Sequence, residues 1–349
     1  MMKPVRVLVV DDSPVMRRLL TSVLEADGSI EVVGVAGDAY EARDAIKTLS
    51  PEVVTLDIEM PRMNGIAFLE KIMQLRPMPV VMVSSHTRKG ADAAIEAMVK
   101  GAFDCVGKPT GLGGSKAFEE LPRIVRHAAK AKMRKRVAAP ETPVKSTAPA
   151  APSGFTPGDR IFLLGASTGG VDALMDLVKE LPSNCPPTLI TQHMPASFSK
   201  SFAAHLNEVS PAQVRMATEG APLSKGVVYV APGGDAHLTV DTRGRGACKL
   251  EPGPKVNGHA PSVDRLFESA TPFAKRVSAA ILTGIGCDGA AGLLSLREGG
   301  AATIGQDQAS SVVYGMPKAA KKLGAVGREL PLAKIAPTLL FTCKTGALV

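Results

Sequence analysis

Short β-branched segments alternate with stretches of helical periodicity along most of this 349-residue chain. In residues 1–127 such a segment recurs about every 25 residues, which is the spacing of strands in βαβ units. The alternation predicts a parallel sheet with helices on both faces. The expected strands are Val5–Val10, Glu31–Val35, Val53–Leu56, Val80–Val83 and Phe103–Val106, and the expected helices are 14–26, 40–48, 64–74, 91–100 and 116–129.

Residues 159–349 repeat the alternation without sharing a motif with residues 1–127, which predicts a second α/β domain. Between the two, residues 128–158 are rich in Ala, Pro, Lys and Ser and almost free of large apolar side chains, as is typical of a linker. The strands expected in the second domain are Ile161–Leu164, Thr188–Thr191, Val227–Val230, Ala279–Thr283 and Ala302–Gly305, and the helices are 171–181, 197–209, 262–270, 289–298 and 316–323.

The net charge of +8 is concentrated in the linker, which holds six basic residues and one acidic residue. A basic face spread over a domain is therefore not expected, and the segment Lys130–Arg136 fits a solvated helix end better than a site for nucleic acid or an acidic partner. No apolar run reaches the roughly 18 residues of a membrane span. The first apolar run is short and is followed by Asp11 and Asp12, so it is not a secretory signal. The five cysteines form no C-x-x-C pair, which argues against a zinc site or a disulfide framework. These features predict a soluble, reduced, cytoplasmic protein. We also expect the protein to be monomeric.

Polar residues follow four of the expected strands in residues 1–127. Asp11 and Asp12 follow the first strand, Asp57 the third, Ser84 the fourth and Lys108 the fifth. Ligands of open α/β sheets gather at the carboxyl ends of the strands, so these side chains are expected to meet. Three clustered carboxylates need a hard cation, and Mg²⁺ is suited to them. Asp57 beside Mg²⁺ could accept a phosphoryl group, with Ser84 and Lys108 contacting the phosphoryl oxygens.

The stretches V-L-V-V-D-D-S-P, T-L-D-I-E-M-P-R-M-N-G, V-M-V-S-S and G-K-P closely resemble the receiver domain of two-component response regulators. The resemblance covers residues 1–127 and implies a flavodoxin-like, five-stranded parallel sheet. It also implies phosphorylation of Asp57 by a histidine kinase, with Mg²⁺ held by Asp12 and Asp57 and aided by Asp11 and the backbone carbonyl of Glu59. Cys105 stands where receivers often carry a switching aromatic residue.

A glycine-rich segment, G-A-S-T-G-G, lies between a strand and a helix at the start of the second domain. It could cradle a phosphate, form a tight turn, or hold Ser167 as a nucleophile with nearby N–H groups as an oxyanion hole. The segment lacks the G-K-[ST] of a P-loop, and the next strand ends in Gln192 and His193 rather than in the acidic residue of a dinucleotide-binding fold.

The residues after two other strands favour the nucleophile. His193 follows one strand and Asp288 follows another, so Ser167, His193 and Asp288 are expected at one sheet edge as a catalytic triad. Cys287 is a rival nucleophile, but no electropositive surroundings are apparent for it, and we expect it to be inert.

Residues 160–323 resemble the catalytic domain of chemotaxis protein-glutamate methylesterases in the stretches G-A-S-T-G-G, T-Q-H-M-P, V-Y-V-A-P-G-G-D-A-H-L, N-G-H-A-P-S-V-D-R-L-F and L-T-G-I-G-C-D-G-A-A-G-L. A receiver, a linker and this doubly wound α/β domain in this order match the whole enzyme. The resemblance implies hydrolysis of glutamyl methyl esters on chemoreceptors, with release of methanol, and deamidation of receptor glutamines. It implies an oxyanion site at Thr168 and the loop 284–286, in which Ile285 replaces the usual Met of the family.

Because the esterase reaction needs no phosphate, we expect the receiver to regulate access to the site: the unphosphorylated receiver would obstruct the esterase site, and phosphorylation of Asp57 would release it. The esterase reaction itself needs no cofactor in this interpretation. The alternative is a non-enzymatic response regulator whose second domain is an interaction or DNA-binding module. No helix-turn-helix pattern supports that alternative.

Overall fold

The structure is a computed structural model that describes residues 3–85, 87–109, 118–131 and 155–345. The chain separates into two compact units, and the division falls within the predicted linker 128–158. Most of that linker, with most of the segment Lys130–Arg136, lies outside the described residues. In the described part of the chain, no helix has both the length and the apolar character needed to cross a bilayer.

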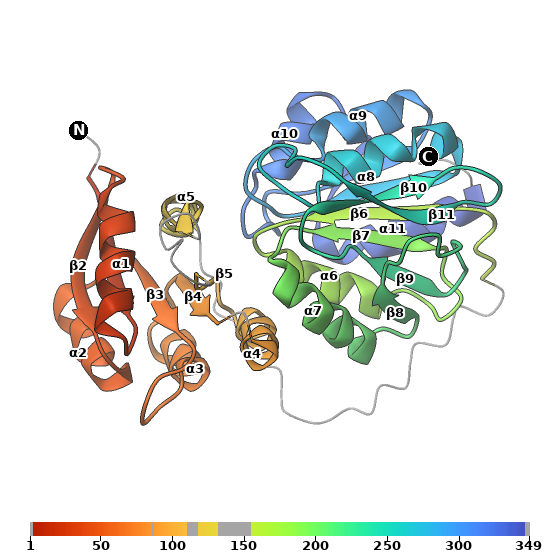
Figure 1. Cartoon of the computed structure of the whole chain (residues 1–349). Coiled ribbons are helices and arrows are strands. Elements are labelled where there is room, and N and C mark those ends of the chain that lie inside the picture. The colour runs from red at the N-terminus through yellow and green to blue at the C-terminus, as the bar shows by residue number, and fades with distance from the viewer. Residues whose placement is uncertain (1–2, 86, 110–117, 132–154, 346–349) are drawn as a thin grey trace. The chain divides into compact units, whose positions relative to one another are not determined.

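The first unit is a five-stranded parallel sheet in the order β2-β1-β3-β4-β5 with helices on both faces (Figure 1). This confirms the α/β fold predicted for residues 1–127. Its strands are β1 (Val5–Val10), β2 (Ile30–Ala36), β3 (Val53–Asp57), β4 (Val80–Ser84) and β5 (Asp104–Gly107), and its helices are α1 (Pro14–Glu25), α2 (Ala39–Leu49), α3 (Gly65–Leu75), α4 (Arg88–Val99) and α5 (Leu121–Ala128).

Side-chain caps set the starts of the first four of these helices, α1 to α4. The hydroxyl of Ser13 accepts a hydrogen bond from the Met16 N–H, so Ser13 rather than Asp12 caps α1. Thr87 caps α4 in the same way through the Gly90 N–H, and α4 therefore begins three residues before the predicted start at residue 91. The carboxylate of Asp12 is left exposed at the end of β1.

The second unit contains a seven-stranded parallel sheet in the order β14-β13-β12-β6-β7-β9-β8. The chain starts in the middle at β6, builds one side of the sheet, and then returns to build the other side from β12. This arrangement confirms the doubly wound fold. The strands are β6 (Ile161–Ala166), β7 (Thr188–Gln192), β8 (Gln213–Met216), β9 (Val227–Val230), β12 (Val277–Ile281), β13 (Ala302–Gln306) and β14 (Arg328–Leu330).

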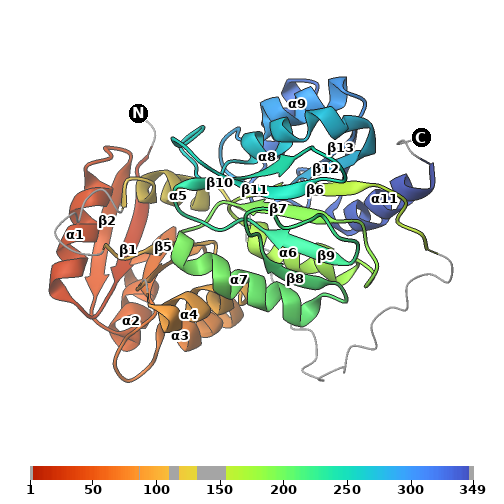
Figure 2. The same cartoon turned by 45° about the vertical axis from the view of Figure 1, so that its right-hand side comes forward.

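Two helical layers cover this sheet, as Figures 1 and 2 show. One layer holds α8 (Val263–Ser269), α9 (Ala290–Glu298) and α10 (Met316–Lys322), and the other holds α6 (Gly170–Lys179), α7 (Ala196–Val209) and α11 (Leu332–Thr345). The buried core between the first layer and the sheet includes Leu163, Tyr229, Phe267 and Leu293.

Several elements were not predicted. The antiparallel hairpin β10 (Ala236–Asp241) and β11 (Ala247–Pro252) packs against α8, and β8, β14, α11 and a 3-10 helix over Thr271–Arg276 are also additional. The strand predicted at Ala279–Thr283 is instead Val277–Ile281, and residues 282–289 form the loop after it. That loop carries Ile285 and Asp288.

Candidate functional site

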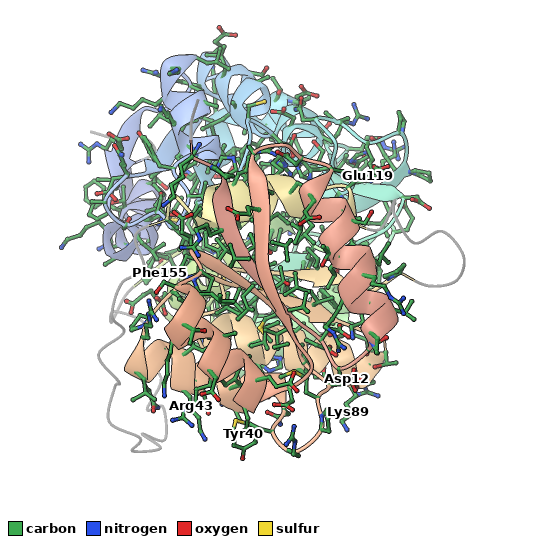
Figure 3. All side chains as sticks on the ribbon, turned by 90° about the vertical axis from the view of Figure 1, so that its left-hand side faces the viewer. Asp12, Tyr40, Arg43, Lys89, Glu119 and Phe155 are labelled. Atoms are coloured by element: carbon green, nitrogen blue, oxygen red, sulfur yellow. The ribbon has the colours of Figure 1, made fainter. Side chains whose placement is uncertain are left out.

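The first unit gathers its predicted acidic residues at the carboxyl end of its sheet. In the described part of the chain, only Asp11, Asp12 and Asp57 bring three metal-ligating atoms within 4.8 Å of one another. Asp11 and Asp57 are buried, whereas Asp12 is exposed. Figure 3 shows Asp12, Tyr40 and Lys89, which follow β1, β2 and β4, at the same end of the sheet.

Lys108 is the cation that faces this acidic cluster. Its Nζ atom lies 3.0 Å from Oδ2 of Asp11 and 2.8 Å from Oδ2 of Asp57. Burial and the charge of Asp11 raise the pKa of Asp57 to about 6, although Lys108 counteracts both. Burial alone would lower the pKa of Lys108, but the two aspartates outweigh it and raise that pKa. The single positive charge of Lys108 therefore does not neutralise the negative charge of the carboxylates.

The residues present fit a divalent cation. Buried hard oxygen donors with an incompletely compensated negative charge are what Mg²⁺ binds, and one exposed carboxylate leaves the cluster accessible from solvent. The N–H of Glu59 donates to Oδ1 of Asp57 at 3.3 Å, while the role of the Glu59 carbonyl stays a prediction.

Two other predicted receiver residues lie near this end of the sheet. The hydroxyl of Ser84, at the end of β4, is buried and donates to the Gly90 carbonyl at 2.8 Å. Cys105 lies in β5 and is also buried, and burial raises the pKa of its thiol well above the usual value.

In the second unit, Ser167 lies immediately after β6, and α6 begins three residues later at Gly170. Its N–H donates to the Thr283 carbonyl at 3.0 Å, and its carbonyl accepts from the Gly170 N–H at 2.7 Å. Gly169 has a φ of +76°, a left-handed conformation that side chains with a Cβ rarely adopt. A Cβ there would also lie 2.6 Å from that of Val312, so glycine is needed for this tight turn.

His193 follows β7, the strand beside β6. Because Ala166 pairs with Gln192, Ser167 and His193 extend the register of neighbouring strands by one position. The side chain of Gln192 ties these two strand ends together by donating to the carbonyls of Ser167 and His193 at 2.9 and 3.0 Å.

His193 and Asp288 form a buried pair. Nε2 of His193 lies 2.8 Å from Oδ2 of Asp288, and the two side chains are 6% and 1% exposed. Nδ1 of His193 is buried and has no hydrogen-bond partner among the described residues. Nδ1 of His193 is therefore available to bond another group. Ser167 lies at the end of β6, the strand that pairs with β7. Hydrogen bonds to a nucleophile are often long before substrate binds, and they tighten in the reacting complex.

The carboxylate of Asp288 is held by the start of α8. It accepts hydrogen bonds from the Ser262 hydroxyl at 2.8 Å and from the Val263 N–H at 2.6 Å, and Asn257 donates to it at 3.3 Å. Burial alone would raise the pKa of Asp288, but the bonds from His193, Val263 and Ser262 outweigh it and hold the pKa below the usual range. Asp288 is therefore an anion suited to stabilising a protonated imidazole.

The predicted oxyanion region lies beside Ser167, but it offers fewer available N–H groups than predicted. The Gly284 N–H is already bonded to the Val313 carbonyl at 3.0 Å and cannot serve as a donor. The N–H groups of Ile285 and Gly286 make no hydrogen bond within the described residues. A Cβ on Gly284 would lie 2.7 Å from that of Ser167, which places this loop against the serine. The Ile285 side chain points into the interior and is 2% exposed.

Sequence reasoning missed the residues that support the site. Thr283 bonds the Thr168 carbonyl and the Val313 N–H through its hydroxyl, at 3.0 and 2.9 Å, and so joins the serine loop to residues 310–315. His237 accepts from the Ser262 N–H at 3.0 Å and holds the segment that binds Asp288. His237 lies in the unpredicted strand β10, and Thr283 lies in the loop after β12 although it was predicted as the last residue of that strand, so a search for polar residues that follow predicted strands does not find either contact. Cys287 is a free, exposed cysteine, and among the described residues its thiol makes no hydrogen bond.

Known proteins resemble the chain over both units. The family model for the CheB methylesterase matches residues 162–339, and that for the response regulator receiver domain matches residues 7–114. A protein-glutamate methylesterase/protein-glutamine glutaminase of Agrobacterium fabrum is 53% identical over 337 residues, 96% of this chain and 95% of the relative. A Caulobacter vibrioides protein of the same designation is 52% identical over 97% of this chain and 98% of its own length. The crystal structure of the Thermotoga maritima CheB methylesterase catalytic domain matches 53% of this chain and 99% of that domain, with a TM-score of 0.51 and 35% identity.

Proposed function

The chain belongs to the CheB methylesterase family, and from that membership and the site geometry we propose that it hydrolyses glutamyl methyl esters on chemoreceptor proteins, releasing methanol. We propose the same site for the deamidation of receptor glutamines, because an amide and an ester present the same acyl carbon to a nucleophile. The observation that carries the proposal is the buried His193–Asp288 pair at the strand end next to Ser167.

In the proposed reaction, Nδ1 of His193 takes the proton of the Ser167 hydroxyl as the oxygen attacks the ester carbonyl. Asp288 orients the imidazole through Nε2 and stabilises its protonated form. The N–H groups of Ile285 and Gly286, together with those near Thr168, stabilise the oxyanion. Collapse of the intermediate returns the proton from His193 to the leaving methoxide, which departs as methanol. Water, activated by His193, then hydrolyses the acyl-enzyme and restores Ser167.

We propose that the receiver regulates this reaction through phosphorylation of Asp57 by a chemotaxis histidine kinase. Asp11, Asp12 and Asp57 would hold Mg²⁺, which when bound neutralises charge on the transferring phosphoryl group. Lys108 lies where it can contact a phosphoryl oxygen on Asp57, since its Nζ atom is already 2.8 Å from the carboxylate. The proposed location is the cytoplasm, where kinase and receptor signalling domains meet.

Methanol release from receptor-containing membranes with radiolabelled methyl esters tests the proposal. We expect release by the intact chain and loss of release in Ser167→Ala. The competing function, a non-enzymatic regulator that binds DNA, predicts no methanol and retardation of DNA with a steep dependence on salt. Release that is unaffected by Ser167→Ala would reject the assigned site.

A further inference from the structure

A two-residue turn approaches the His193–Asp288 pair from outside the strands that carry it. Val256 and His259 bond each other in both directions, with N···O distances of 3.0 and 2.9 Å. The central residues, Asn257 and Gly258, have φ values of +52° and +86°, and both are left-handed. Asn-Gly is the pair that favours such a tight hairpin turn, so the local sequence fixes this geometry.

Two side chains of this turn, one central and one flanking, reach the two members of the pair. The ring of His259 stacks on that of His193 with a centroid separation of 3.7 Å and an interplanar angle of 9°. The amide of Asn257 donates to Asp264 at 2.8 Å and to Asp288 at 3.3 Å. The Asp264 carboxylate also accepts from the Gly292 N–H at 2.7 Å, so the turn is tied to both α8 and α9.

A single hydrogen bond to Asp288 does not fix the plane of an imidazole, because the ring can still tilt about that contact. A parallel aromatic face at van der Waals distance restricts this tilt and leaves the ring nitrogens in the plane free to react. A catalytic group must be held within about 0.5 Å and 10–20° of its productive geometry. We propose that His259 is a positioning residue that sets the plane of His193 through its stacked face. This inference rests on the proposed function.

Three variants of the intact chain separate stacking from simple loss of packing. His259→Leu keeps a side chain of similar volume but removes the flat face, His259→Phe keeps the face but removes the ring nitrogens, and His205→Leu is a control. His205 lies on α7 and bonds the carbonyl of Ser201 one turn earlier, within the same helix. Thermal melting of each variant checks that the fold is retained.

We expect His259→Leu to lower kcat for methanol release roughly 10- to 100-fold with little change in KM, because the base is misplaced while substrate binding persists. His259→Phe is expected to recover most of the activity, to within a few-fold of the wild type, and His205→Leu is expected to behave as the wild type. Equal losses in the Phe and Leu variants, or a change confined to KM, would overturn a role for the stacked face. Wild-type activity in the Leu variant would overturn it as well.

A second measurement separates failure of this inference from failure of the proposed substrate. The rate at which a small alkyl fluorophosphonate modifies Ser167 reports activation of the serine by His193 without any receptor. We expect the same order, wild type and Phe faster than Leu. If the wild type releases no methanol, and yet the wild type and the Phe variant react with the reagent faster than the Leu variant, the positioning role stands and the proposed substrate is rejected. If methanol is released but Leu and wild type react equally with the reagent, the positioning role falls alone.

Discussion

Replacing Ser167 should abolish the proposed reaction with little effect on the stability of the fold. The Ser167 side chain is small and 7% exposed, and within the described residues its hydroxyl bonds no other group, whereas its backbone bonds do not depend on that hydroxyl. Ser167→Ala is therefore expected to keep the melting temperature and to lose about 10⁴-fold or more in kcat. Cys287→Ala is the matched control, because it changes an exposed thiol next to Asp288 in the chain to alanine. Loss of turnover in Cys287→Ala with retention in Ser167→Ala would assign the nucleophile to the cysteine.

Ile285 tests whether the oxyanion region acts through backbone or side chain. Its side chain is buried, and methionine has a similar volume, so Ile285→Met should cost less than about 1.5 kcal/mol of stability. The N–H group is retained, and we expect kcat to stay within a few-fold of the wild type. Denaturant unfolding and methanol release measure the two effects. A change in kcat of ten-fold or more with unaltered stability would show that the side chain shapes the site.

The raised pKa of Asp57 predicts that its proposed phosphorylation depends on pH. Burial first, and then the charge of Asp11, raise this pKa to about 6, so in the absence of a divalent cation the carboxylate is half protonated near pH 6. Only the ionised form can attack a phosphoryl donor. A bound cation favours the ionised form and lowers the pKa.

We therefore expect the rate of phosphorylation by acetyl phosphate to fall as the pH drops through about 6 when Mg²⁺ is limiting. The midpoint of this fall should move to lower pH as Mg²⁺ approaches saturation. The phosphorylated fraction at a series of pH values and Mg²⁺ concentrations gives the midpoint. A midpoint that stays constant, or moves upward with Mg²⁺, would contradict metal binding at Asp57.

At the scale of elements, the strand ends were predictable and the loops were not. Asp11, Asp57 and His193 each follow a run of buried β-branched or apolar residues, and parallel strands bring their carboxyl ends to one edge. Asn257 and His259 lie in a short turn whose approach to the site depends on how α8 and the β10–β11 hairpin pack. No local periodicity encodes that approach. The hairpin was missed although each of its strands has six residues, because strands were sought as continuous β-branched runs and β10 instead alternates apolar with polar residues.

The turn between β6 and α6 gives a test at this scale. In Gly169→Ala the new Cβ meets the Val312 Cβ at 2.6 Å and must also adopt a φ of +76°. Gly220→Ala is the matched control, since its φ is +72° and no atom lies within 4 Å of the new Cβ. The strain of φ alone costs about 1–2 kcal/mol in either variant. We expect Gly169→Ala to lose more stability than Gly220→Ala and also to lose turnover, because the turn that holds Ser167 must shift. Equal stability losses with normal turnover would show that the turn accommodates the methyl group.

At the scale of the whole molecule, the two α/β units were predictable because each contains its own alternation of strands and helices. The exact boundaries at 127 and 159 stay predictions, since the segment 132–154 lies outside the described residues. Residues 159–349 nevertheless hold every predicted esterase residue, and the relative from Thermotoga maritima was crystallised as a catalytic domain alone. The second unit is therefore expected to fold when it is expressed separately.

That independence gives a test of regulation. No phosphate is needed for an ester hydrolysis by Ser167, so a receiver in the same chain would act by restraining the esterase until Asp57 is phosphorylated. A coupling free energy of about 1–3 kcal/mol corresponds to a 5- to 150-fold change in activity.

We expect the fragment 159–349 to release methanol faster than the unphosphorylated full chain by a factor in this range. Asp57→Ala should keep the full chain at its low rate, and a phosphoryl donor with Mg²⁺ should accelerate the wild-type chain but not the fragment. If the fragment is as slow as the unphosphorylated chain while phosphorylation still accelerates the intact protein, the receiver does not restrain the esterase. It would instead have to activate the esterase directly.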